Sequence, residues 1–340
     1  MSLDVAKERL SYHFNNSSDF DEIEIDLFGG EPFLYPDFII DIVEWTKSQQ
    51  FNKPFIFFAS TNGTKIHGPI QDWLKLNKEF ICLSLSIDGL PETHNFNRNN
   101  SYSKIDIDFF RNTYPFQDIR MTINEKTLSN LSDNIIHLHN KGFLVSAVFA
   151  QDIEWKNKNN NRILLHEILK LSQYYIENSN IEVCSLLDSY LQSILIDDDI
   201  LKKENTKWCG TGTNMIAIDI KGNEYPCQMF LPSSMPLSCE WENIDFKEND
   251  IFTDNECNSC LIKNICGTCY GLNIRSRGDI KKRDKHLCDF NKILCLGTSY
   301  LLGQLFELEN FGRYDSVYEK LNVIKAIENV QIAYSSLYKF

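Results

Sequence analysis

The cysteines of this chain are concentrated in one segment, which restricts how that segment can fold. Of the eleven cysteines, nine lie between Cys209 and Cys295, and only Cys82 and Cys184 lie outside it. The N-terminal residues do not resemble a signal peptide, so we expect a cytoplasmic protein, in which disulfides are rare. A local crowd of thiols then predicts metal binding. Metal–thiolate bonds would substitute for the core that this loop-rich segment lacks.

The spacing within the segment also indicates metal ligands. Cys209 and Cys227 flank a predicted strand and turn, and a C-x2-C-x5-C-x2-C motif follows them. The motif and the cysteines after it are Cys257, Cys260, Cys266, Cys269, Cys288 and Cys295. Thiolates two residues apart can reach one metal centre from a single turn. Spacing alone fits two four-thiolate zinc sites as well as two iron–sulfur clusters.

The balance of charge limits the partners of the chain. Its 340 residues include 47 acidic and 34 basic side chains, a net charge of −13. This surplus disfavours a nucleic acid, which is approached through its phosphates, and favours a peptide or a small molecule. No apolar run approaches the roughly 18 residues that a membrane helix needs, so no membrane partner is expected. The one basic cluster, Arg275–Lys285, is either a solvated turn or a set of cations beside metal-bound thiolates.

The first half of the chain alternates strand-like and helix-like segments, which predicts βα units around parallel strands. The predicted strands are 23–28, 55–60, 80–87, 119–123 and 143–149. The predicted helices are 5–14, 36–49, 69–76, 107–112, 131–141 and 163–176, with a closing helix within 314–340. The strands are rich in Ile, Val, Leu and Phe, as in strands buried on both faces. The alternation fits a barrel and a doubly wound sheet equally well.

Small polar residues and glycines follow three successive predicted strands. The loops are Leu27–Pro32 (LFGGEP), Ser60–Gly63 (STNG) and Ser84–Gly89 (SLSIDG). Glycines let the backbone approach a ligand closely, and Pro32 fixes the chain as it leaves the strand. Loops at the carboxyl ends of barrel strands are where such folds place their chemistry. One such loop fits an ordinary tight turn, but the repetition predicts a cradle for a polar cofactor.

These three loops, at these intervals, resemble those of the radical SAM enzymes. The cysteine pattern resembles the SPASM domain that follows the barrel in their peptide-modifying branch. The resemblance covers roughly Ile23 to Cys295. It implies an α/β fold with a partial (β/α)6 barrel that lacks its first strand, then a small cysteine-rich SPASM domain and a C-terminal helix. The implied domains are residues 1–180, 181–305 and 306–340.

The resemblance also implies which residues contact S-adenosylmethionine. In that family the GGEP turn holds the amino group of the cofactor, and here this turn is Gly29, Gly30, Glu31 and Pro32. Residues at the following strand ends contact the carboxylate or ribose of the cofactor, or the substrate. By position these residues are Ser60, Asn62, Ser86 and Asp88, with Thr122 and Asn124 as further candidates on the next strand.

Two auxiliary 4Fe–4S clusters are implied in the SPASM-like domain. The ligands implied for the first cluster are Cys209, Cys227 and Cys269. The ligands implied for the second cluster are Cys257, Cys260, Cys266 and Cys288. The fourth position of the first cluster is Cys239, Cys295 or open. The final gap, before Cys269, is two residues where the family has three.

One family motif is absent. Radical SAM enzymes bind their catalytic 4Fe–4S cluster through C-x3-C-x2-C after the first barrel strand, and these 340 residues contain no such triplet. The family layout would place it upstream of Met1, so the chain is either a truncated form or a natural inactive relative. The intact loop Gly29–Pro32 favours truncation, because a protein that never bound the cofactor would not need it. A third 4Fe–4S cluster is expected only with the upstream motif.

The resemblance implies a maturase that modifies a peptide or protein by hydrogen abstraction with a 5′-deoxyadenosyl radical. This oxidoreductase activity needs an electron donor such as flavodoxin or ferredoxin, and the chain alone is predicted to be inactive. Gln228 follows Cys227 where a sulfatase maturase would have an acid, which favours crosslink or thioether formation in a ribosomal peptide. The alternative is a catalytically inactive protein that binds a precursor peptide or a partner maturase.

Overall fold

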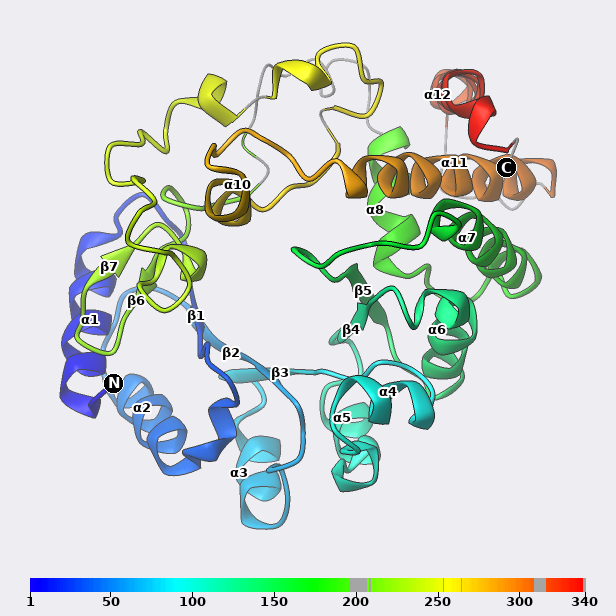
Figure 1. Cartoon of the computed structure of the whole chain (residues 1–340). Helices are drawn as coiled ribbons and strands as arrows, with labels where there is room; N and C mark the ends of the chain where they lie inside the picture. The colour runs from blue at the N-terminus through cyan, green and yellow to red at the C-terminus, as the bar shows by residue number, and fades with distance from the viewer. Residues whose placement is uncertain (196–206, 208, 253, 264, 309–315, 339–340) are drawn as a thin grey trace. The chain divides into compact units, whose positions relative to one another are not determined.

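Parallel strands alternate with helices up to Phe149, as the sequence predicts. The computed structural model describes residues 1–195, 207, 209–252, 254–263, 265–308 and 316–338. The strands β1 (Ile23–Asp26), β2 (Phe55–Thr61) and β3 (Ile81–Leu85) form one parallel sheet in that order (Figure 1). β4 (Ile119–Ile123) pairs in parallel with β5 (Val145–Phe149). A parallel bridge between Ser86 and Arg120 continues this order from β3 to β4.

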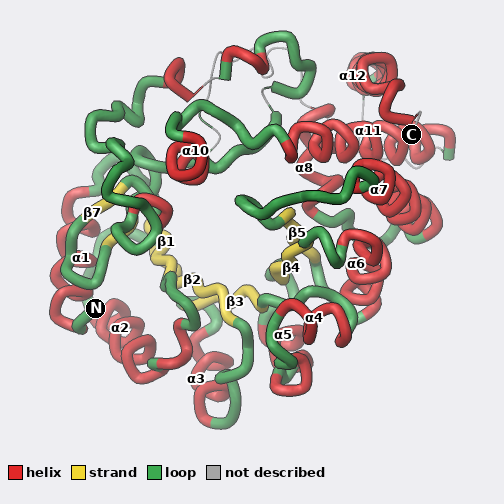
Figure 2. Tube along the Cα trace, in the orientation of Figure 1, coloured by secondary structure: helices red, strands yellow, loops and turns green. Residues whose placement is uncertain are grey.

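The helices between the strands begin where the sequence provides start signals. Proline, whose fixed φ suits a first helical turn, opens α2 (Pro36–Ser48), α3 (Pro69–Asn77) and α4 (Pro91–Asn97). Side-chain oxygens cap α1 (Leu3–Asn16) and α5 (Ile107–Thr113), and α6 (Leu131–Asn140) precedes β5. Figure 2 shows β1 to β5 following a curve, with α2, α3 and α5 on its outer side. Helix α4 has only seven residues and was not predicted from the sequence.

The strands differ in burial, and this corrects one prediction. Four of the five residues of β3 are buried, as expected of a central parallel strand. In β1, however, Ile23 and Ile25 are only half-buried and Glu24 and Asp26 are exposed. The expectation of burial on both faces is therefore wrong for β1. The reason is that β1, among the described strands, pairs with β2 alone and so has an edge.

Four helices pack together in the second half of the chain. α11 (His286–Glu307) contacts α7 (Asn160–Glu177), α8 (Ser185–Leu195) and α12 (Val317–Tyr334). A Cβ at Gly297 would lie 2.1 Å from Ile168 Cγ2, so only glycine permits this approach of α11 to α7. The helices α7 and α12 confirm the two helices predicted for these regions. The long helix α11 was not predicted, because its sequence lies within the cysteine-rich segment.

The cysteine-rich segment contains little regular structure but has a core. β6 (Ala217–Ile218) and β7 (Glu224–Tyr225) form a two-stranded antiparallel hairpin, and α10 (Tyr270–Arg277) ends at a glycine in the left-handed conformation. Phe230, Phe252 and Tyr270 are buried together in one hydrophobic cluster. The expectation that the segment has no core is therefore wrong. Its aromatic residues are spaced without helical or strand periodicity, so the sequence pattern did not reveal them.

Contacts divide the chain into two compact units. Unit 1 comprises Met1–Ile123, Asp133–Phe149 and Asp219–Asn223, and therefore contains β1 to β5. Unit 2 comprises Asn124–Ser132, Ala150–Ile218 and Glu224–Phe340, and contains the cysteine-rich segment with α7, α8, α11 and α12. Among the described helices, none is both long enough and apolar enough to cross a membrane.

Candidate cofactor and metal sites

Glu31 joins the loops that follow β1 and β2. Its Oε1 accepts hydrogen bonds from Phe33 N at 3.1 Å and from the Thr61 hydroxyl at 2.7 Å, and its Oε2 accepts one from Asn62 N at 2.7 Å. The Thr61 hydroxyl accepts a further bond from Gly63 N at 3.0 Å. Hydrogen bonds to an ionised carboxylate are stronger than neutral ones. One side chain therefore holds the GGEP and STNG loops together.

Gly29 and Gly30 leave open space beside this junction. No atom lies within 4 Å of the position that a Cβ would take at either residue, and neither has a positive φ. Gly89 is different, because its φ is 97° and a Cβ there would lie 2.3 Å from the Cβ of Asn134. The chain's own packing thus requires Gly89 but does not require Gly29 or Gly30. The space beside these two glycines is free for a ligand.

The other predicted contact residues of these loops are half-buried. Pro32 opens a single 3-10 turn, Ser60 lies on β2, and Ser86 follows β3 directly. The Oδ1 of Asn62 accepts hydrogen bonds from Thr64 N at 2.9 Å and from the Thr64 hydroxyl at 2.7 Å. The side-chain oxygen of Asn62 is therefore engaged in its own turn, while its amide nitrogen is the group that remains for a ligand.

Asp88 is buried, and the chain itself occupies its carboxylate. Arg98 forms a bidentate pair with it, with Nε 2.7 Å from Oδ2 and Nη2 3.0 Å from Oδ1. Asn97 Nδ2 donates to Oδ2 at 3.1 Å, and Thr122 N donates to Oδ1 at 2.9 Å. Four donors use most of what a carboxylate can accept. This geometry supports a role for Asp88 in ordering the loop after β3.

His94 lies next to this loop and is fully buried. Its Nδ1 accepts a hydrogen bond from Asp88 N at 3.3 Å, and its Nε2 lies 2.9 Å from the Ser101 hydroxyl. Burial lowers the pKa of His94 to about 4, and the neighbouring Asp88 carboxylate only partly opposes this effect. The imidazole is therefore neutral at pH 7. A neutral ring that accepts at Nδ1 carries its proton on Nε2, from which it donates to Ser101.

The three cysteines implied for the first cluster lie near one another in unit 2. Gly212 N donates to Pro226 O at 2.8 Å, which joins the chain just after Cys209 to the chain just before Cys227. Cys269 is the N-cap residue of α10. Removal from water raises the pKa of the Cys269 thiol, and the charges of Cys227 and Cys209 raise it further. The three sulfurs are thus close enough to influence one another.

The cysteines implied for the second cluster form a second group. Burial raises the pKa of the Cys288 thiol to about 11, and the charges of Cys266 and Cys257 contribute to this shift. The pKa of the Tyr190 hydroxyl is also raised, mainly by burial and in part by the charges of Cys266 and Cys260. Cys257, Cys266 and Cys288 are therefore close enough to influence one another. Cys260 is joined to Cys257 by a backbone hydrogen bond of 2.9 Å, and its sulfur lies near Tyr334 and Cys295.

The two alternatives for the fourth ligand of the first cluster lie in different places. Cys239 packs against the hydrophobic cluster that contains Cys227. Cys295 is fully buried in α11, and burial together with the charge of Cys260 raises the pKa of its thiol to about 12. Cys239 is therefore near the first group and Cys295 near the second. Of the two, Cys239 is better placed for the first cluster.

A pocket lies among the cysteines of unit 2. Its lining includes Cys266, Cys269 and Cys288, together with the side chains of Arg283 and Asn291. Asn291 Nδ2 donates to Cys266 Sγ at 3.1 Å, and Arg283 Nη1 donates to Cys266 O at 2.6 Å. The Nε of Arg283 is buried and has no hydrogen-bond partner. The pocket thus combines thiols with donors that are suited to an anionic, sulfur-rich group.

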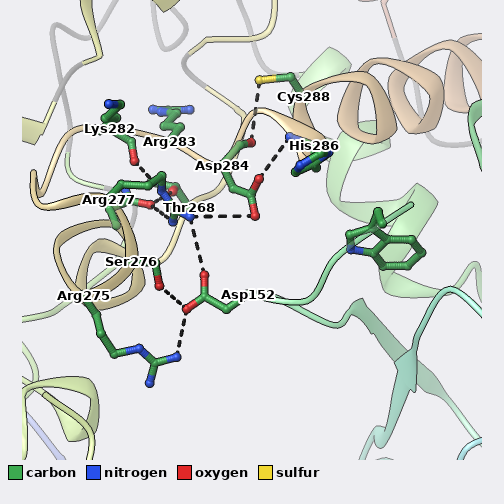
Figure 3. A network of polar contacts seen from close by, with 12 residues as sticks. Asp152, Thr268, Arg275, Ser276, Arg277, Lys282, Arg283, Asp284, His286 and Cys288 are labelled. Carbon is green, nitrogen blue, oxygen red and sulfur yellow. Dashed lines mark hydrogen bonds and ion pairs between the residues drawn. The ribbon is translucent and has the colours of Figure 1, made fainter. Parts of the chain in front are cut away.

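A network of ion pairs borders the same pocket (Figure 3). Asp152, at a left-handed φ of 56°, accepts hydrogen bonds from Arg275 Nη2 at 2.9 Å and from the Ser276 hydroxyl. Arg277 Nη1 lies 3.5 Å from Asp152 Oδ1 and 3.9 Å from Asp284 Oδ2. These carboxylates neutralise the first part of the basic cluster that the sequence contains. The network joins the loop after β5 to α10 within unit 2.

The donor chemistry of these residues suits an iron–sulfur cluster. Four-thiolate clusters are tuned by hydrogen bonds to their sulfurs, and this group offers one amide donor and one unpartnered guanidinium nitrogen. Among the side chains that the structure describes, no three Cys, His, Asp or Glu residues are grouped closely enough to surround a single metal ion.

Sequence reasoning missed Thr61 and Arg98. Thr61 stands within the STNG motif, and its place on β2 next to the chosen Ser60 was a usable signal. Nothing in the sequence pairs Arg98 with Asp88, because α4 separates them and was not predicted. Thr122 lies on β4, whereas Asn124 belongs to unit 2, where its Oδ1 accepts a hydrogen bond from Lys126 N at 2.9 Å.

Known proteins resemble this chain in sequence and in fold. No family model matches the sequence. The chain is 23% identical over 310 residues to the radical SAM cyclopropyl synthase TigE of Paramaledivibacter caminithermalis. That match covers 86% of this chain and 62% of the relative, so the chain spans less than two thirds of the relative's length.

The solved structures similar to this chain include anSMEcpe, a radical SAM sulfatase maturase with a SPASM domain. With bound AdoMet, histidine-tagged anSMEcpe has a TM-score of 0.69 and 19% identity, and the match covers 95% of this chain and 89% of that one. With AdoMet and the Cp18Cys peptide, the TM-score is 0.66 at 19% identity, over 96% and 90% of the chains. The shared fold confirms the predicted α/β architecture. This chain is thus similar in sequence to a radical SAM cyclopropyl synthase and similar in fold to anSMEcpe.

Proposed function

We propose that this chain contains the cofactor cradle and the auxiliary clusters of a radical SAM/SPASM maturase that modifies a peptide or protein. The observation that carries the proposal is the junction at Glu31, where one carboxylate joins two strand-end loops beside the open space at Gly29 and Gly30. S-adenosylmethionine, when bound with a catalytic cluster, supplies a 5′-deoxyadenosyl radical that abstracts a hydrogen atom from the substrate.

The residues of unit 1 would bind and orient the cofactor. Gly29 and Gly30 would give its amino group access to the backbone, because no atom of the described residues lies within 4 Å of a Cβ at either position. Glu31 and Pro32 fix the course of this loop. Ser60, Asn62 and Ser86 would contact the carboxylate or ribose of the cofactor. Asp88 would act as a positioning residue, since Arg98 and its other donors occupy the carboxylate.

The cysteines of unit 2 would hold two auxiliary 4Fe–4S clusters. The first would be bound by Cys209, Cys227, Cys269 and, as the fourth ligand, Cys239. The second would be bound by Cys257, Cys260, Cys266 and Cys288. The mutual effects of the thiols on their pKa values support this division.

The substrate of such a maturase would be a peptide, as expected from the net charge and supported by the peptide complex of anSMEcpe. A flavodoxin or ferredoxin would supply electrons. Formation of a new bond within a peptide remains our preferred reaction type, and the cyclopropyl synthase TigE is a relative whose name agrees with it. The proposed location is the cytoplasm, where thiols stay reduced.

Binding of S-adenosylmethionine by the 340-residue chain tests the cradle. We expect weak but measurable binding by the wild type in anaerobic equilibrium dialysis. In Glu31→Gln the affinity should fall at least about tenfold, because an amide cannot accept all three hydrogen bonds that Glu31 accepts. Glu79→Gln is the matched control, since Glu79 is exposed. Equal binding by the wild type and both variants would contradict the assigned cradle.

Detection of 5′-deoxyadenosine tests the catalytic part of the proposal. Under strong reductant we expect none from these 340 residues, which lack C-x3-C-x2-C. A form extended upstream to include that motif should produce it. Product from the shorter chain would contradict the proposed role of the missing motif. A lack of product from the extended form would favour the inactive, peptide-binding relative.

A further inference from the structure

Arg283 is a cation that lies beside cysteines and has no carboxylate partner among the described residues. Its neighbour Lys285 lies 3.2 Å from Asp254 Oδ2 and 2.9 Å from Glu256 Oε2, and is therefore neutralised. Arg283 Nη1 instead donates to the carbonyl of Cys266, and its Nε is buried without a partner. A partly buried charge with an unused donor is costly unless an anionic acceptor lies next to it.

The sulfurs of the second cysteine group are candidates for that acceptor. The positive charge of Arg283 lowers the pKa of the Cys257 thiol, although burial raises that pKa by more. The pocket that Arg283 lines also contains Cys266 and Cys288. Arg283 therefore faces the place where the second cluster would lie.

Two further donors reach the same group from other helices. Asn291, on α11, donates from Nδ2 to Cys266 Sγ at 3.1 Å. Tyr334, on α12, is largely buried, and its hydroxyl lies 3.6 Å from Cys260 Sγ. A metal-bound thiolate has no proton to give, so Tyr334 would be the donor in that pair.

We propose that Arg283, Asn291 and Tyr334 form a donor shell that raises the reduction potential of the second auxiliary cluster. The inference rests on the proposed function, because it requires that cluster. Reduction adds negative charge to a cluster that four thiolates already make anionic. A cation and hydrogen-bond donors stabilise the reduced form more than the oxidised form, so they raise the potential.

The first cysteine group differs in this respect, which supplies an internal reference. The cation beside Cys209 is Lys207, which donates to Thr211 O, Thr213 Oγ1 and Phe246 O, whereas Cys269 lines the same pocket as Arg283. Among the described residues, no side-chain donor lies within hydrogen-bond distance of Cys209, Cys227 or Cys269 sulfur. Changes in the donor shell should therefore shift the second cluster more than the first.

The experiment is a redox titration of anaerobically reconstituted full chain, followed by electron paramagnetic resonance. The signal that survives in Cys269→Ala identifies the second cluster. In Arg283→Gln we expect its midpoint potential to shift to a more negative value, with a smaller shift of the first cluster and the iron content retained. Arg283→Lys should shift this midpoint potential less, because lysine keeps the positive charge. Lys282→Gln, which removes an exposed charge from the same segment, should leave both potentials unchanged.

If Arg283→Gln fails to retain the cluster, the variants Tyr334→Phe and Asn291→Leu still test the donor shell. Each removes one donor, and each should lower the potential of the second cluster more than that of the first. Two results would overturn the donor shell but not the cluster assignment. One is a wild-type potential in every variant that retains its clusters, and the other is an equal shift in Arg283→Gln and Lys282→Gln. A wild-type chain that binds no iron would overturn the cluster assignment, and the donor shell with it.

Discussion

The strand-end loops of unit 1 and the cysteine-rich segment of unit 2 are organised in opposite ways. In the loops, polar groups satisfy one another: Glu31 accepts three hydrogen bonds and Asp88 accepts four. In the cysteine-rich segment, burial raises the pKa of Cys269 and Cys288, and a guanidinium nitrogen has no partner. The loops are therefore preorganised by the chain itself, whereas the cysteine-rich segment contains a buried donor that the described residues leave unpaired.

Removal of iron should produce the largest difference between the two regions. Structural metal sites contribute on the order of 10 kcal/mol to folding. We expect chelation of the reconstituted protein to abolish slow amide hydrogen exchange across 209–295, while the amides of β3 stay protected. Mass spectrometry of exchange in loaded and chelated samples measures both regions at once. Equal loss of protection in β3 and in the cysteine-rich segment would break the comparison.

Breaking the ion pair at Asp88 tests how far unit 1 depends on its internal pairs. Arg98→Leu leaves a buried carboxylate without its counter-ion and should lower the free energy of unfolding by about 3–5 kcal/mol. Adding Asp88→Asn should restore part of this loss, as a double-mutant cycle by urea denaturation would show.

The matched control for this cycle is Arg111→Leu, because the pair between Arg111 and Asp108 is exposed. That variant should change the free energy of unfolding by less than about 1 kcal/mol. Similar losses of unfolding free energy in Arg98→Leu and Arg111→Leu would mean that the buried pair at Asp88 stabilises the fold no more than an exposed pair does.

Two glycine substitutions separate packing from ligand space within unit 1. Gly89→Ala should cost about 2–3 kcal/mol, because φ is 97° and the new Cβ would overlap Asn134. Gly29→Ala should leave the melting temperature nearly unchanged, because nothing lies within 4 Å of the new atom. Thermal denaturation of both variants checks this. A large fall of the melting temperature in Gly29→Ala would contradict the open space beside this residue.

A further expected effect is a pH dependence from His94. Its ordinary pKa of 6.5 falls to about 4 in the folded chain, so between these values the unfolded chain binds the extra proton. The free energy of unfolding should therefore fall as pH drops from 6.5 to 4, by up to about 1 kcal/mol per pH unit. Urea denaturation at several pH values would measure a flatter slope in His94→Gln. Parallel slopes for the two proteins would exclude His94 as the source.

The sequence predicted the strands of unit 1 well because their apolar runs and the polar loops after them are local signals. The predicted strand 119–123 has the bounds of β4, and the helix predicted from Pro36 begins where α2 begins. The long helix α11 was missed because its cysteines and glycines suggested a loop. Its stability comes from contacts with α7, α8 and α12, which no local pattern records.

The candidate sites, too, could be predicted from the sequence only where the signal is local. The motifs pointed to Glu31, but only the structure shows that its carboxylate joins two loops through Thr61 and Asn62. The division of the cysteines into two ligand groups was implied by the family resemblance, and it stays a prediction. The partners of Asp88 and the donors around Cys266 and Cys260 could not be predicted, because they come from residues distant in the sequence.

The position of Cys288 in α11 has a consequence for the life of this protein in the cell. The first turn of the helix carries this proposed ligand, while Gly297, further along, packs directly on Ile168 of α7. An unfilled cluster would loosen the start of α11 and with it the packing of the neighbouring helices. Partly opened proteins are degraded faster than closed ones. Iron supply would therefore govern how much of this protein accumulates, and synthesis without cluster assembly would yield mainly proteolytic turnover.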